Sequence, residues 1–170
     1  CNYTSTFNGT SSAAPTVAGV VALMLEANPN LTWRDVKHIL ALTADQVGTD
    51  SNFTYRAPSS GITLYEWETN SAGYKFHNWF GFGKIDAAEA VSTALTYTAD
   101  SRGSFVDTGY IGSSLANSVI GWGANNRNDL SVTKPSGSND FVEFVRVSVT
   151  FSHTLPKSVG LRLESPDGTM

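Results

Sequence analysis

The chain has 170 residues, of which 41% are hydrophobic and 15% charged, enough apolar material for one ordinary globular domain or one and a half small ones. The formal net charge is −4 and the sequence holds no block of like charge, which excludes electrostatic attraction to nucleic acid or to an anionic membrane surface. The longest apolar stretch, residues 13–25, is shorter than the ~20 residues that cross a bilayer, so we expect a buried helix and no membrane span.

The first residues suggest that the chain continues upstream. The sequence opens on Cys1, without a start methionine or a charged-then-apolar leader, and we expect that a segment precedes it. Cys1 is the only cysteine, so any disulfide partner lies outside this chain. Asn-x-Thr sequons at Asn2, Asn8, Asn30 and Asn52 indicate glycosylation in a eukaryotic secretory protein, but in an Asn- and Thr-rich bacterial sequence they arise by chance, which is the interpretation we favour.

Two helices are predicted near the N-terminus. Apolar residues occur on every side of a 3.6-residue period over residues 11–27, which predicts a helix buried all round in the core of an α/β domain. A second, amphipathic helix is expected over residues 33–43, because the Thr32 hydroxyl and the Asp35 carboxylate have the spacing of a capping box. The inward residues of that helix are Val36, Ile39 and Leu40.

The rest of the first half alternates between loop and helix. Residues 48–71 are polar, with one short extended piece expected near residues 62–67. The run "YKFHNWFGFGKIDAAEAVSTAL" then predicts an aromatic extended segment, a glycine turn and a third helix with Asp86 as N-cap and Glu89 three residues later. This pattern closes the first domain near Leu95.

From Phe105 onward the texture is that of an all-β module, with Gly, Ser, Asn and Asp between short apolar runs. Residues 141–151 alternate as a half-buried strand does. Residues 159–163 repeat the alternation, and a type I turn follows at residues 166–168. A module of this size is marginal as a folded domain, so we expect its sheet to continue past Met170. The apolar face of the first strand consists of Val145, Val147, Val149 and Phe151.

Ser11 is the strongest candidate for chemistry. It stands in "GTSSAAP", residues 9–15, directly before the first predicted helix. A serine hydroxyl becomes a nucleophile only with a base, a group that orients the base, and donors for the developing oxyanion. A helix N-terminus offers unpaired N–H groups and a positive dipole end, which suits an oxyanion. For an arbitrary serine at a helix start, an ordinary N-cap is the more common explanation.

The string "GTSSAAP" closely resembles the G-T-S-x-A-x-P nucleophile signature of the subtilisin-like serine proteases, which assigns the nucleophile to Ser11 and not to Ser12. The segments "LEANPNLTWRDVKHIL" and "GFGKIDAAEAV" resemble the kexin and furin-like proprotein convertase branch. Farther on, "VEFVRVSVTFSHT" and "LRLESPDGT" resemble the opening of the β-sandwich P domain of that branch. The chain departs from the branch at residues 156–159, where Pro-Lys-Ser-Val replaces an Arg-Gly-Asp-Leu-like turn.

The resemblance implies an α/β subtilisin-like catalytic domain, of which this chain holds the C-terminal part, followed by a partial all-β, jelly-roll-like P domain. Residues 1–96 are then the end of the peptidase domain with its nucleophile, residues 97–104 a linker, and residues 105–170 the first part of the P domain. The implied activity is that of a secreted or extracellular serine endopeptidase, exported through the periplasm in a bacterium. It acts on protein or peptide substrates through an acyl-enzyme on Ser11.

In this family the triad Asp and His and the oxyanion Asn precede the serine, so all three are expected upstream of Cys1. The upstream part of the same protease is therefore an expected partner, as is a propeptide or chaperone. The resemblance also implies structural Ca²⁺, although no run here has recognisable ligand spacing, and the chemistry needs no cofactor. We interpret the histidines and four aspartates of this chain as structural: His38, His77, His153, Asp35, Asp45, Asp50 and Asp86.

Two alternatives remain open. The competing class is a pseudoprotease or a non-catalytic fragment that binds or stabilises a protein partner, which an upstream segment lacking His or Asp would indicate. Within enzymes, a broad-specificity bacterial subtilisin is the rival, because the acidic residues that favour Arg or Lys substrates precede the nucleophile. No zinc, redox or phosphate-binding motif supports a different chemistry.

Overall fold

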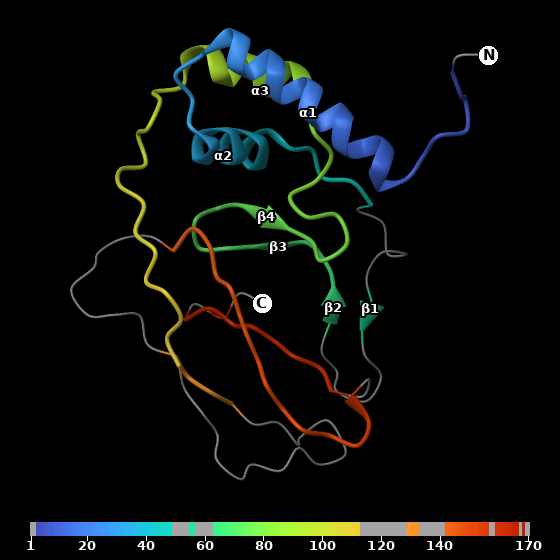
Figure 1. The fold of residues 1–170 in the computed structure, drawn as a ribbon, viewed down its shortest axis with the longest axis vertical. Coiled ribbons are helices and arrows are strands. Elements are labelled where there is room, and N and C mark those ends of the chain that lie inside the picture. The colour runs from blue at the N-terminus through green and yellow to red at the C-terminus, as the bar shows by residue number, and fades with distance from the viewer. Residues whose placement is uncertain are drawn as a thin grey trace. The chain divides into compact units, whose positions relative to one another are not determined.

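The computed structural model describes residues 3–48, 55–56, 63–112, 129–132, 142–156, 159–166 and 168. The chain divides into two compact units, Cys1–Ser104 and Phe105–Gly168, which are considered separately. The first unit holds all the helices and strands that the structure assigns among these residues (Figure 1).

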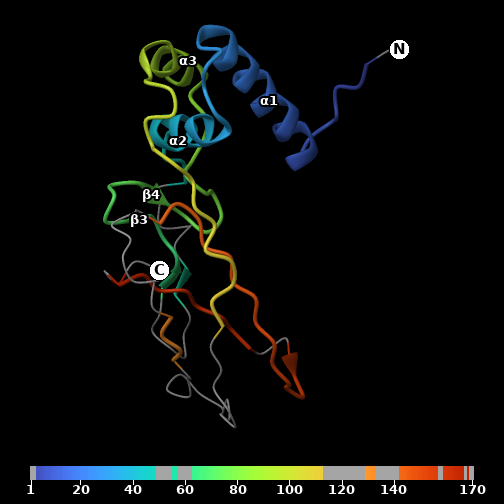
Figure 2. The ribbon, with the colours of Figure 1, turned by 60° about the vertical axis from the view of Figure 1, so that its left-hand side comes forward.

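Three helices build the core of the first unit: α1 (Thr10–Ala27), α2 (Trp33–Thr43) and α3 (Ala87–Thr96). Helix α3 packs against both α1 and α2, and Figures 1 and 2 show the three together at one end of the unit. The predicted inward residues of α2 are confirmed, since Val36 and Ile39 are buried and Leu40 packs against them. The buried apolar residues of this core are Met24, Leu31, Val36, Ile39, Ala90 and Ala94.

Both predicted helix starts are confirmed. At α2 the Thr32 hydroxyl accepts a hydrogen bond from the Asp35 N–H, and the Asp35 carboxylate accepts one from the Thr32 N–H, which completes the capping box. At α3 the Asp86 carboxylate accepts from the Glu89 N–H at 2.9 Å. Each side chain satisfies a backbone donor that the helix itself leaves unpaired.

The prediction that α1 is buried all round is wrong for this chain. Met24 is its one buried residue, whereas Leu23 is 51% and Leu25 38% exposed. The described residues cover α1 chiefly with α3, and its N-terminal turns extend past the other two helices (Figures 1 and 2). With 18 residues and a mean hydropathy of 1.3, α1 also meets the length and composition of a membrane span, contrary to the expectation drawn from residues 13–25. A core helix of a soluble protein meets the same criterion.

The strands are short and lie in two antiparallel pairs. Strand β1 (Tyr55–Arg56) pairs with β2 (Thr63–Tyr65), and β3 (Glu68–Thr69) pairs with β4 (Lys75–Phe76). Strand β2 lies within the extended piece expected at residues 62–67. The aromatic run is less extended than predicted, because only β4 is a strand and a tight turn follows at residues 77–81.

The second unit contains no assigned strand among its described residues, so the strands predicted at 141–151 and 159–163 are not formed there. Side chains of the predicted apolar face are exposed, with exposed fractions of 57% for Val147 and 42% for Phe151. A strand takes its hydrogen bonds from a neighbouring strand, and the described residues of this unit supply none. The predicted turn near the C-terminus does close, with the Gly168 N–H donating to the Ser165 carbonyl at 3.0 Å. A jelly-roll fold of this unit stays a prediction.

Candidate active site

Ser11 is the second residue of α1 and its side chain is exposed. The N-cap is Gly9, which makes no side-chain cap, so Ser11 is not an ordinary N-cap serine. Gly9 has φ 78° and ψ −167°, a backbone region that is open almost only to glycine. Its carbonyl accepts from the N–H groups of Ser12 and Ala13, both at 3.1 Å. A glycine in a backbone region that other residues rarely adopt therefore starts the helix two residues before the candidate nucleophile.

The polar groups of Ser11 are available for chemistry. Its N–H belongs to the first turn, where amide groups have no acceptor within the helix. Pro15 lies four residues on and has no N–H, so it leaves the Ser11 carbonyl without its helical donor. The Thr16 hydroxyl supports this turn by donating to the Ser12 carbonyl at 3.1 Å. Among the described residues, the Ser11 hydroxyl makes no hydrogen bond.

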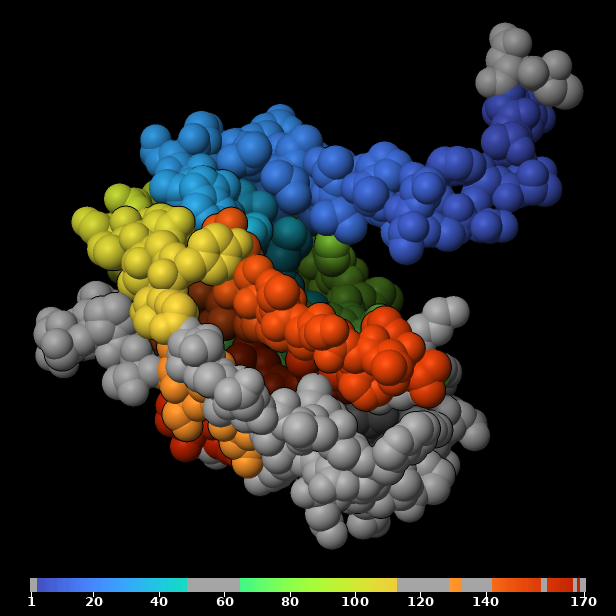
Figure 3. Space-filling model, turned by 60° about the horizontal axis from the view of Figure 1, so that its bottom comes forward, coloured from blue at the N-terminus to red at the C-terminus, as the bar shows by residue number. Residues whose placement is uncertain are grey.

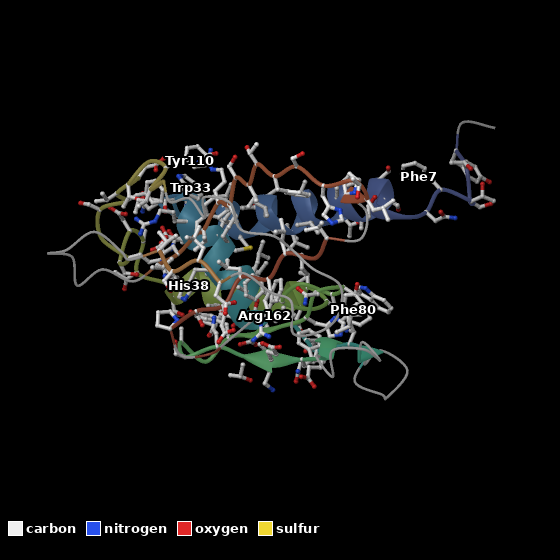
Figure 4. The ribbon with its side chains drawn as sticks, turned by 90° about the horizontal axis from the view of Figure 1, so that it is seen from below. Phe7, Trp33, His38, Phe80, Tyr110 and Arg162 are labelled. Atoms are coloured by element: carbon white, nitrogen blue, oxygen red, sulfur yellow. The ribbon has the colours of Figure 1, made fainter. Side chains whose placement is uncertain are left out.

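His38 is engaged away from Ser11. Its Nδ1 lies 2.6 Å from the Tyr97 hydroxyl, and its Nε2 is hydrogen bonded to the Tyr74 hydroxyl. Both tyrosines also meet the imidazole edge-on, with ring centroids 5.7 Å apart. Figure 4 shows His38 well away from Phe7, which precedes the Ser11 turn. His38 therefore ties α2 to the β3–β4 hairpin and to the end of α3.

The other two histidines also hold backbone turns. His77 is 1% exposed, its Nδ1 accepts from the Trp79 N–H at 3.0 Å, and its ring packs against Trp67 and Phe80. In the second unit, His153 Nδ1 accepts from the Leu155 N–H at 3.0 Å. These contacts are those of structural histidines, as expected from the sequence.

The aspartates considered above have structural roles where they are described. Asp45 pairs with Lys84 at 3.2 Å, and Asp86 caps α3, while Asp50 lies outside the described residues. Calcium, which the resemblance implies, has no evident ligand set in the described ranges, because no three His, Cys, Asp or Glu side chains come together there.

Asp35 has a further contact that local sequence patterns do not indicate. Its Oδ2 accepts from the Thr32 N–H and hydroxyl, both at 2.8 Å, and from the Asp100 N–H at 3.0 Å, and the side chain is fully buried. Burial alone raises the pKa of this carboxyl, but the hydrogen bonds from Asp100 and Thr32 and the charge of Arg34 outweigh it and lower the pKa. The second oxygen, Oδ1, is buried with no partner among the described residues.

Comparison with known proteins identifies the family. The subtilase family (Peptidase_S8) matches residues 1–83. "Neuroendocrine convertase 2" of Caenorhabditis elegans is 33% identical over 185 residues, which span 98% of this chain and 27% of that protein. Human "Proprotein convertase subtilisin/kexin type 5" is 32% identical over 173 residues, which span 98% of this chain and 8% of that protein. The chain belongs to the kexin- and furin-type subtilisin-like proteases.

A solved structure agrees with this assignment. The serine protease of Aeromonas sobria superposes on 58% of this kexin-type chain and 18% of its own, with a TM-score of 0.50 and 34% identity. The subtilisin-like fold is thus supported for the first part of the chain. The chain spans about a quarter of the worm convertase and less than a tenth of the human one.

Proposed function

We propose that the protein containing this chain is a serine endopeptidase of the subtilisin/kexin type and that Ser11 is its nucleophile. The observation that carries the proposal is the exposed Ser11 hydroxyl in the first turn of α1, within the family signature at residues 9–15. The triad His and Asp and the oxyanion Asn are assigned to the polypeptide upstream of Cys1, where the family order places them. His38 and His77 are unsuited to act as the base, since both are hydrogen bonded to other groups.

In the proposed reaction the Ser11 Oγ attacks the scissile carbonyl carbon while the upstream His takes the hydroxyl proton. The carbonyl oxygen becomes an oxyanion, which the unpaired Ser11 N–H and the dipole of α1 stabilise together with the upstream Asn. The His then gives its proton to the leaving amine, and the C–N bond breaks to leave an acyl-enzyme on Ser11. Water, deprotonated by the same His, releases the acid product and restores the hydroxyl.

The setting of the protease follows from the same assignment. We propose a secreted or extracellular enzyme that acts on proteins or peptides, with a propeptide or chaperone as a further partner. The exposed Leu23 and Leu25 of α1 support a close association with the upstream part of the protease, because a soluble core helix buries such side chains.

A serine-directed fluorophosphonate tests the proposal on the full-length protein, with the adduct located by peptide mass. We expect the label on Ser11, its loss in Ser11→Ala and its retention in Ser12→Ala, which changes the neighbouring hydroxyl of the same turn. Absence of label, with a known subtilisin labelled in parallel, would favour the alternative of a pseudoprotease that binds or stabilises a protein partner. Label on Ser12 would reassign the nucleophile.

A further inference from the structure

The segment that follows α3 is held against the start of α2. Arg34 is 9% exposed, and its guanidinium donates to the carbonyls of Arg102, at 3.3 Å, and Gly103. The neighbouring Asp35 carboxylate accepts from the Asp100 N–H at 3.0 Å. Figure 3 shows the olive-yellow atoms of this segment against the light-blue atoms around the start of α2. We call Arg34, Asp35 and residues 100–103 the junction latch.

Residues 100–103 form a turn inside the latch. Asp100 has a positive φ of 55°, and the Gly103 N–H donates to the Asp100 carbonyl at 3.3 Å. Upstream, the Asn28 side-chain amide donates to the carbonyls of Ala94 and Tyr97, both at 3.0 Å, and so fixes the chain as it leaves α3. The segment is therefore anchored at several points of its backbone before the second unit begins.

The latch contains a basic residue, Arg102, just before the end of the first unit at Ser104, so a cut there would break the chain between the two units. Arg102 is the only Lys or Arg between Lys84 and Arg127, so a peptidase that cuts after basic residues has one possible site in this span, the Arg102–Gly103 bond. Ser101 and Gly103 are exposed, so the site is at the surface. Proteases bind their substrates as extended strands, and a turn whose carbonyls are already hydrogen bonded cannot adopt that form without opening.

We propose that Arg34 and Asp35 keep the Arg102–Gly103 bond inaccessible, which makes it a latent cleavage site for endopeptidases specific for basic residues. When the latch opens, such an enzyme adds water across this amide, leaving a carboxylate on Arg102 and a new amino terminus at Gly103. The cut thereby breaks the covalent link between the first and the second unit. The inference does not depend on Ser11 being a nucleophile, because the cleaving enzyme is a separate one.

The free energy needed to open the junction latch determines how well the Arg102–Gly103 bond is protected from cleavage. Hydrogen bonds to charged groups are stronger than neutral ones, and both Asp35 and Arg34 act through charge. Where opening and closing are fast compared with cleavage, the rate of cleavage follows the population of the open segment. Loss of the Asp35 charge should therefore raise the rate of cleavage at Arg102 directly.

Limited digestion with trypsin tests the proposal. The full-length protein is used with Ser11→Ala, which prevents self-cleavage, and products that begin at Gly103 are quantified by mass. We expect Asp35→Asn to raise the initial rate of this cut about tenfold or more. The matched control is Asp45→Asn, which removes one charge from an exposed ion pair and should leave the rate unchanged. Urea-unfolded protein should be cut promptly at Arg102.

Hydrogen exchange keeps the proposal testable where a variant fails to fold. In the Ser11→Ala protein the Asp100 and Gly103 amides should exchange much more slowly than the exposed amide of Ser101. Fast exchange at both positions overturns the latch, as does cleavage of Asp35→Asn at the rate of Asp45→Asn. Ready cutting at Arg102 in the folded parent protein overturns it as well.

Discussion

The backbone at Gly83 lies so close to Asp45 that a β-carbon on Gly83 would stand 2.2 Å from the Asp45 carbonyl oxygen. The two segments are joined there by two backbone hydrogen bonds. The Asp45 N–H donates to the Lys84 carbonyl at 2.8 Å, and the Lys84 N–H donates to the Asp45 carbonyl at 2.9 Å. Gly83 also has a φ of 126°, which L-residues rarely adopt. The glycine before the third helix is thus required by a close crossing of two loops.

We expect Gly83→Ala to destabilise the first unit by more than the about 1–3 kcal/mol that backbone strain alone costs, because the Asp45 carbonyl must also move. The matched control is Gly81→Ala, where φ is 59° and nothing lies within 4 Å, so that only the strain remains. Thermal unfolding of both variants measures the difference. Equal losses would show that the close crossing relaxes freely.

The lowered pKa of Asp35 predicts that the stability of the folded protein falls at low pH. The pKa of this carboxyl is lowered on folding from the ordinary value of 3.8, so the carboxylate stabilises the folded state above that pH, and the contribution is lost as pH falls from there through the folded pKa. The unfolding temperature of the Ser11→Ala protein should drop more steeply between pH 5 and 2.5 than that of the same protein with Asp35→Asn. Parallel curves would mean that other carboxylates dominate.

The hydrogen bond between His38 and Tyr97 predicts an energetic coupling between these two side chains. Replacing His38 by Phe removes a hydrogen-bond partner from both the Tyr74 and Tyr97 hydroxyls, and leaving a part-buried hydroxyl unpaired costs about 1–3 kcal/mol. We expect Tyr97→Phe to destabilise the parent protein but to cost little in the His38→Phe background. A double-mutant cycle by thermal unfolding measures this, and additive effects would argue against the bridge.

Local sequence patterns predict where the helices begin. They do not predict which distant residues contact those helix starts. The Thr32–Asp35 and Asp86–Glu89 pairs are three residues apart and visible in the sequence, whereas the bond from Asp100 to Asp35 joins residues 65 apart. The apolar period of α1 likewise indicated burial, but the segments that cover a helix are distant in the sequence, so the pattern could not identify them. The alternation at 145–151 indicated a face, but a strand needs a neighbour for its hydrogen bonds.

Gly9 gives the last prediction, which concerns the proposed nucleophile. A β-carbon at Gly9 meets nothing within 4 Å, so Gly9→Ala acts through backbone strain alone, at φ 78° and ψ −167°. Relief of that strain rotates the turn that presents Ser11, and a misplacement of about 1 Å costs roughly a hundredfold in such reactions. We expect fluorophosphonate labelling of Ser11 to slow by at least tenfold.

The matched control is Gly73→Ala, which is also at positive φ in open space but lies in the β3–β4 turn. This variant should lose similar stability and label at the normal rate. Equal labelling of the two variants would show that the Gly9 turn does not position Ser11.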